Sequence, residues 1–168
     1  MFKIEFNTTT ELGKIDTEDT SVGEAIWTIH PYYENDVFIQ WKGYQIELDK
    51  RGTISDIYND LIYLLDELQA GNPQFTISFL CSGFTAYWHF RVEKNVITIH
   101  PQFFEVAIKR NDDYLDMKEI RQLDLDIEIG FDHFISEWNK LLKSIKDDLL
   151  KVGYTEDLEN FEYLRNLK

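Results

Sequence analysis

The stretch Phe75–Lys109, FTISFLCSGFTAYWHFRVEKNVITIHPQFFEVAIK, is the part of this chain that decides the expected fold. It divides into three predicted strands, Phe75–Leu80, Phe84–Val92 and Val96–Ile108. We expect the third strand to break near Pro101, because proline cannot donate a hydrogen bond to a neighbouring strand. Since side chains alternate across a strand, the middle strand has one apolar and one polar face. The stretch therefore predicts an antiparallel meander with one buried side.

The turn between the second and third strands fixes which residues face each other. Lys94 and Asn95 fit a two-residue hairpin turn. This turn sets up two pairs on the core face, Val92 with Ile97 and Phe90 with Ile99. On the polar face it pairs Arg91 with Thr98 and His89 with His100.

The rest of the chain supplies further strands and two long amphipathic helices. Strands are predicted at Phe2–Phe6, Ala25–His30, Asp36–Trp41, Tyr44–Leu48 and Leu123–Ile129. A Lys42-Gly43 turn should pair Trp41 with Tyr44, Ile39 with Ile46 and Val37 with Leu48. Helical spacing of apolar residues predicts helices at Thr53–Ala70 and Asp132–Val152, each capped by its first residue, and a last short helix from Thr155. Asn7–Gly23 is expected to be a long loop.

These elements predict the fold class. We expect a single acidic α+β domain over residues 1–168, with a meander-rich antiparallel sheet of about six to eight strands. Both long helices should pack on one side of that sheet, with the short helix at the C-terminal end.

Charge is the strongest feature of the composition. The chain has 31 Asp and Glu against 17 Lys and Arg, a net charge of −14, and residues 1–110 and 111–168 contribute equally. Such a surface repels nucleic acid and anionic lipid and speeds encounter with basic proteins. The alternative is that the charge only keeps the protein in solution. Neither a signal sequence nor a membrane-spanning apolar run is recognisable, so a cytoplasmic location is expected.

Catalytic and metal-binding motifs are not recognisable in this sequence. Cys81 is the only cysteine, which rules out an internal disulfide and a cysteine metal cluster. We expect its thiol to act as a small buried apolar group rather than a nucleophile. We therefore predict no catalytic residue, metal or cofactor, and an enzyme is the less favoured class.

The polar face of the meander is one candidate ligand site. Tyr87, His89, Arg91 and His100 share this face, and two facing histidines with an arginine could bind phosphate or share a metal. Against this, no third ligand occurs at a recognisable spacing. A polar sheet face of this kind is ordinarily the solvated side of an antiparallel sheet.

A second candidate site is an acidic ridge formed by Asp124, Asp126 and Glu128 on the predicted strand Leu123–Ile129. Three carboxylates spaced by about 7 Å along a strand are too far apart to bind one metal unaided, but they suit a basic protein. The alternative is that they protect an edge strand from aggregation.

In size, acidity and aromatic content the whole chain resembles the small acidic immunity or antidote proteins that bacteria pair with basic toxins. No motif carries this resemblance. It implies a cytoplasmic inhibitor that covers the basic cleft of a toxin. Two further hypotheses stay open: a small-ligand or hydrolytic site on the His89/His100 face, and a structural or adaptor domain.

Overall fold

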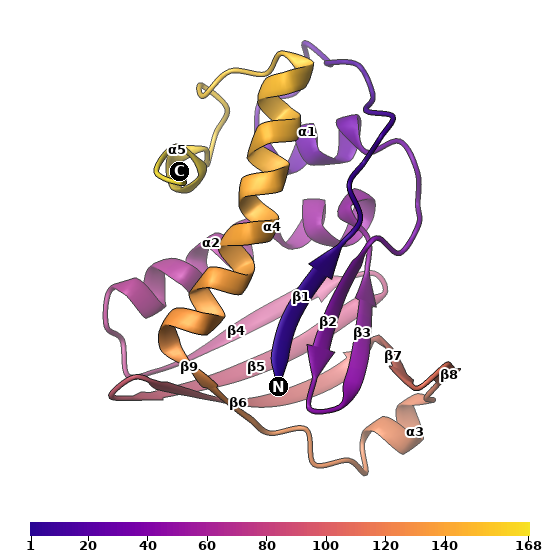
Figure 1. Ribbon diagram of the computed structural model, residues 1–168, viewed down its shortest axis with the longest axis vertical. Coiled ribbons are helices and arrows are strands. Elements are labelled where there is room, and N and C mark those ends of the chain that lie inside the picture. Colours follow the sequence, from indigo (N-terminus) through magenta and orange to yellow (C-terminus); the bar gives the residue numbers. More distant parts are fainter.

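The protein has an α+β fold with two antiparallel sheets and five α-helices, shown in a computed structural model that describes residues 1–168 (Figure 1). The N-terminal sheet has the order β1 (Phe2–Phe6), β2 (Val37–Trp41), β3 (Tyr44–Leu48), β7 (Ala107–Arg110) and β8 (Asp113–Tyr114). The central sheet has the order β4 (Gln74–Cys81), β5 (Phe84–Glu93), β6 (Val96–Glu105) and β9 (Ile127–Gly130). The helices are α1 (Val22–Ile29), α2 (Ser55–Gln69), α3 (Met117–Ile120), α4 (Phe131–Val152) and α5 (Glu162–Arg165), and a π-helical turn at Lys50–Ile54 precedes α2.

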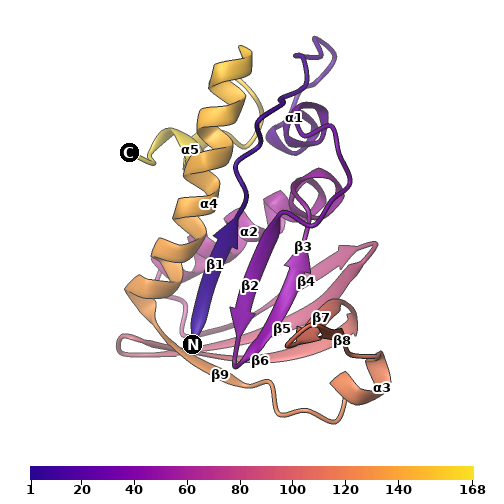
Figure 2. The same ribbon diagram turned by 45° about the vertical axis from the view of Figure 1, so that its right-hand side comes forward.

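The two sheets and the long helices enclose one core. Figure 2 shows the strands β1 to β3 rising from one face of the central sheet, with α2 and α4 on that same side. The indole rings of Trp41 and Trp88, one from each sheet, have centroids 5.0 Å apart and belong to one cluster of 42 buried apolar residues. Trp88 is fully buried, which confirms the register expected for its strand.

Both predicted hairpin registers are confirmed. Trp41 pairs with Tyr44 and Val37 with Leu48, while Val92 pairs with Ile97 and His89 with His100. The long helices also lie on one side of the central sheet, as expected.

The expected single sheet is instead two, because the chain leaves the central sheet at Val106 and enters the other as β7. The break predicted near Pro101 is wrong, because β6 continues through this residue to Glu105. Pro101 pairs with Trp88 at a position where its nitrogen points away from β5, and pairing with β9 ends at Ile99. No hydrogen bond is lost there.

The predicted strand Ala25–His30 is wrong, because this segment belongs to helix α1. Ser21 accepts a hydrogen bond from the Glu24 N–H and the Glu24 carboxylate accepts from the Ser21 N–H, so a capping box starts the helix. The buried residues follow helical spacing: Val22, Ala25, Ile26 and Ile29. The sequence interpretation assigned this segment to a meander and did not take the cap at Ser21 into account.

Smaller corrections concern the ends of elements. The strand expected at Leu123–Ile129 covers only Ile127–Gly130, since the Leu125 carbonyl accepts a hydrogen bond from the Trp41 indole (2.8 Å) instead of joining a ladder. Asp49 rather than Thr53 caps the turn before α2, and Gly130 rather than Asp132 precedes α4. The last helix begins at Glu162 rather than Thr155.

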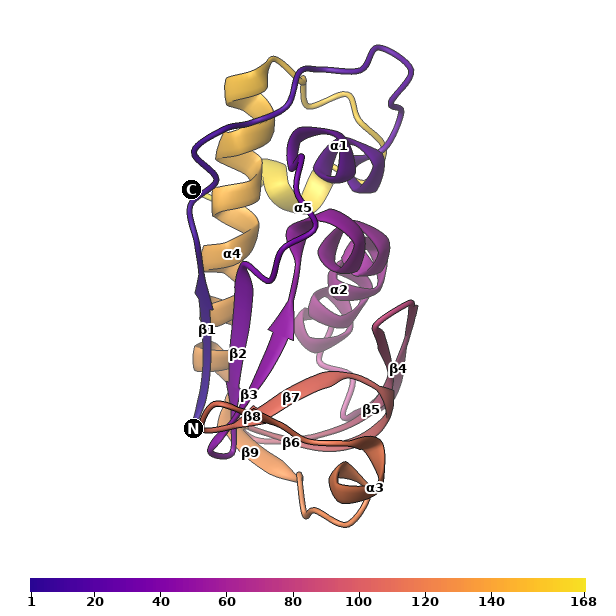
Figure 3. The ribbon, with the colours of Figure 1, turned by 90° about the vertical axis from the view of Figure 1, so that its right-hand side faces the viewer.

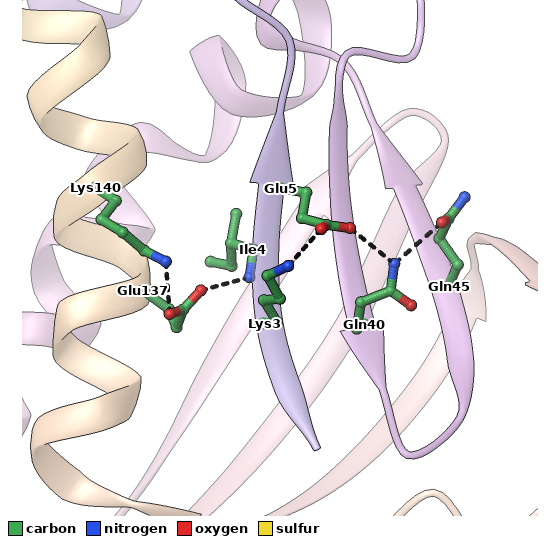
Figure 4. A network of polar contacts seen from close by, with 7 residues as sticks. All are labelled: Lys3, Ile4, Glu5, Gln40, Gln45, Glu137 and Lys140. Atoms are coloured by element: carbon green, nitrogen blue, oxygen red, sulfur yellow. Dashed lines mark hydrogen bonds and ion pairs between the residues drawn. The ribbon is translucent and has the colours of Figure 1, made fainter.

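Helix α4 covers the outer edge of β1 with side chains. The Ile4 N–H donates to the Glu137 carboxylate (2.7 Å), and the His133 ring donates to the Phe2 carbonyl (2.7 Å). Lys140 holds the other Glu137 oxygen at 2.6 Å (Figure 4). These side chains form hydrogen bonds with the outward backbone groups of β1, so those groups are not free to pair with a further strand.

Candidate functional site

The central sheet has one face that no long helix covers. In Figure 3 the helices α1, α2 and α4 lie above this sheet, and only the short α3 lies below it. The lower side, called the open face here, consists of outward side chains of β4, β5 and β6: Thr76, Ser78, Leu80, Tyr87, His89, Arg91, Thr98, His100, Gln102 and Phe104. Leu80 is 71% exposed and Phe104 48%, so the face combines polar groups with exposed apolar ones.

The four predicted ligand residues do come together on the open face. The rings of His89 and His100 are stacked with centroids 6.1 Å apart, and the Tyr87 ring meets Phe104 edge-on at 5.3 Å. Arg91 is turned aside into an ion pair with Glu93 (2.6 Å).

Both histidines already have hydrogen-bond partners. The nitrogens of His89 contact the Thr76 hydroxyl (2.8 Å) and the Gln102 amide oxygen (3.1 Å). His100 Nδ1 lies 2.5 Å from the Asp126 carboxylate. Nowhere in the chain do three His, Cys, Asp or Glu side chains gather closely enough to hold a metal ion. The role of this pair as a ligand site stays a prediction.

The acidic ridge is only partly a strand feature. Glu128 lies in β9, whereas Asp124 and Asp126 lie in the segment before it. Lys42 contacts the Asp124 carboxylate at 2.8 Å, and this ammonium holds the pKa of Asp124 below its usual range. Because Asp126 contacts His100, Glu128 is the one ridge carboxylate without an ion pair.

The negative charge of the protein lies at its surface and is largely unpaired. Only three of the 31 acidic residues are buried: Asp36, Glu47 and Glu137. Ten carboxylates form ion pairs with Lys, Arg or His, which leaves 21 without one. A surface of this kind attracts cationic partners over a range limited by salt screening.

A groove of about 360 Å³ lies between β6 and α3, beside the open face. Phe104, Ile120 and Leu123 supply apolar walls, and His100 and Arg121 supply polar groups. The Arg121 guanidinium at this groove forms no ion pair.

The buried charged cluster around Lys50 is structural. Its ammonium is fully buried and donates to the Asn7 carbonyl (2.6 Å) and the Thr9 hydroxyl (3.2 Å), with Asp36 at 4.0 Å. Burial lowers the pKa of Lys50 and raises that of Asp36. The cluster ties the loop after β1 to the core.

Cys81 is buried, as the sequence predicts, and burial together with the nearby Asp56 raises the pKa of its thiol to about 12. The thiolate that a nucleophile requires is therefore disfavoured at neutral pH.

Two features escaped the sequence interpretation. Arg51 lies between two aromatic rings, 4.5 Å from the Trp27 centroid and 4.8 Å from that of Tyr33, and only the fold brings them together. The strand β4 is an edge strand without any charged residue. The absence of charge is visible in the sequence, but the position at an edge is not.

Comparison of the chain with protein-family models, with curated proteins and with solved structures found no match. None of the helices is both long and apolar enough to cross a membrane.

Proposed function

We propose that this protein is a cytoplasmic binding domain for a basic protein, of the kind that an immunity or antidote protein provides against a toxin. The observation that carries the proposal is the set of 21 acidic side chains without an ion-pair partner. Repulsion among them disfavours the compact fold, and a cationic partner would relieve that cost. Complementary charge at an interface raises the association rate and can add affinity.

The ridge of Asp124, Asp126 and Glu128 is the first surface to test. Glu128 is the ridge's one member of the unpaired set, and the ion pairs with Lys42 and His100 fix the positions of the other two carboxylates before a partner arrives.

Affinity capture tests the proposal directly. The protein is immobilised, exposed to extract of its cells of origin at low and high salt, and the retained proteins are identified by mass spectrometry. We expect a basic protein that high salt releases. Retention of no basic protein at low salt would count against the proposal.

The purified partner then tests the ridge. Asp124→Asn/Asp126→Asn/Glu128→Gln should slow association and weaken its salt dependence. The matched control, Asp157→Asn/Glu159→Gln/Glu162→Gln, removes three exposed charges near the C-terminal end. Equal rates for both variants would remove the ridge from the interface, and aggregation of the ridge variant alone would assign it to edge protection.

The groove between β6 and α3 supports a second candidate function, binding of a small anionic apolar ligand. Apolar walls with an unpaired guanidinium at the rim suit a carboxylate or sulfonate attached to a ring. Titration with the fluorescent dye anilinonaphthalene sulfonate tests it, with Arg121→Gln as the variant and Arg110→Gln as the charge-matched control. Saturable binding that only Arg121→Gln weakens supports the groove, and equal binding by all three proteins argues against it.

A further inference from the structure

The two sheets have four edges, and three of them are protected. Side chains of α4 cover β1, β8 has only two residues, and β9 has four residues with Glu128 among them. The fourth edge, β4, is eight residues long and contains no charged residue, proline or glycine. Natural proteins shorten, charge or cover their sheet edges, because unpaired backbone groups attract further strands.

The unpaired backbone groups of β4 can be assigned from its hairpin with β5. The two-residue turn Ser82-Gly83 makes Cys81 and Phe84 a hydrogen-bonded pair, so bonding to β5 recurs at every second residue from Cys81 backwards. The N–H and C=O groups of Thr76, Ser78 and Leu80 therefore point away from β5. Their side chains are exposed, and β4 has no strand on its other side.

An acidic stripe on α2 runs beside this edge. Asp56, Asp60, Tyr63 and Glu67 lie on one side of the helix at helical spacing. Asp56 lies 3.6 Å from the Cys81 thiol at one end of β4, and Glu67 accepts a hydrogen bond from Asn72 (2.6 Å) just before the other end. Figure 3 shows α2 alongside β4.

The stripe has no cation of its own. Helix α2 contains no Lys or Arg, and burial raises the pKa of Asp60 with no basic group to offset it. From Asp56 to Glu67 the helix rises about 16 Å. Three alternate residues of an added strand span about 13 Å, which covers most of this length.

From these observations we infer that β4 accepts an extended basic segment of the partner protein as an additional strand. Its backbone pairs with Thr76, Ser78 and Leu80, and Lys or Arg at alternate positions faces the α2 stripe. The inference rests on the proposed function, since it takes the partner to be basic. A second copy of this chain is the less favoured occupant, because each copy has a net charge of −14.

A defined peptide tests the inference without knowledge of the partner. The probe is a nine-residue peptide of alternating lysine and valine, compared with the same peptide methylated on every valine nitrogen and with a glutamate–valine peptide. We expect only the unmethylated lysine peptide to bind. At saturation it should slow amide hydrogen exchange at Thr76, Ser78 and Leu80 by at least about tenfold.

Two β4 variants and one matched control separate strand pairing from general charge attraction. Ser78→Pro removes an outward N–H without touching the β5 ladder, and Thr76→Lys/Ser78→Lys charges the edge. The control, Thr98→Lys/Gln102→Lys, adds the same charge to β6 within the open face. Circular dichroism and tryptophan fluorescence confirm that each variant is folded.

We expect both β4 variants to lose at least about tenfold in affinity for the peptide, and the control to lose less. Equal loss in all variants, binding by the methylated peptide, or a β4-mediated dimer in sedimentation would overturn the inference while leaving the proposed function standing. If no lysine peptide binds and no basic protein is captured, both proposals fail.

Discussion

Replacing Glu137 with alanine should uncover the edge of β1. In the native protein its buried carboxylate accepts hydrogen bonds from the Ile4 N–H at 2.7 Å and from Lys140 at 2.6 Å. Alanine leaves that N–H without a partner at a site where Glu137 is only 5% exposed. An unsatisfied buried donor costs about 1–3 kcal/mol, and a charge-assisted hydrogen bond is lost as well. We expect the free energy of unfolding to fall by about 2–3 kcal/mol, which for a chain of this size lowers Tm by roughly 4–12 °C.

Glu137→Gln is the matched control, because the amide oxygen can still accept from Ile4. It should cost less than about 1 kcal/mol, since Lys140 is half exposed and can be hydrated. Urea unfolding followed by tryptophan fluorescence gives both values, and amide exchange at Ile4 reports on the edge itself. A loss below about 0.5 kcal/mol for Glu137→Ala, or unchanged exchange at Ile4, would refute the assignment.

The pH dependence of stability is part of the same test. Burial by itself would raise the pKa of Glu137, but Lys140 and the Ile4 N–H together lower it below the ordinary 4.5. A lowered carboxyl pKa in the folded state stabilises the protein above the unfolded pKa, and this contribution is lost as the pH falls through the folded value. The decline in stability below about pH 4.5 should therefore be shallower in Glu137→Gln.

Three more predictions concern the core and the thiol. Trp88→Ala should cost about 3–5 kcal/mol in urea unfolding, because its ring is fully buried between the sheets; a Tm within a degree of wild type would contradict this. Gly23→Ala should cost about 1–3 kcal/mol of stability, because a Cβ there would lie 2.8 Å from the Ser55 carbonyl oxygen. Gly130→Ala meets only ordinary contacts and should cost less, and thermal melts of the two variants compare them. Cys81 should resist iodoacetamide at pH 8 until urea unfolds the chain, and rapid labelling of the folded protein would contradict its burial. Because the thiol pKa is 9.0 in the unfolded chain and about 12 in the folded one, the unfolded thiol ionises first, and the free energy of unfolding should fall between about pH 9 and 12.

Local patterns predicted the parts of the fold that depend on neighbours in sequence. Two-residue turns fixed the registers around Lys42-Gly43 and Lys94-Asn95, and the same turns placed His89 opposite His100. Ala25–His30 was mistaken for a strand because six residues are too few to establish a helical period, and the deciding cap lies upstream at Ser21. The crossing at Val106 and the exposed edge of β4 depend on contacts between distant segments, for which the sequence holds no local signal. The ridge around Asp124 was placed on too long a strand for the same reason, since Trp41 takes the Leu125 carbonyl.

The crossing at Val106 has a consequence for the order of folding. Pairing of Ile46 with Ile108 closes a long loop that contains α2 and the complete meander β4–β5–β6. Each hairpin within that meander instead joins two strands that are separated by a turn of only two residues. Loop closure costs entropy before its contacts give any return, so the local hairpins should form early and the β3–β7 pairing late. Until β7 pairs with β3, the outer backbone groups of β3 have no strand to bond to. The newly made chain should be most prone to aggregate during that interval.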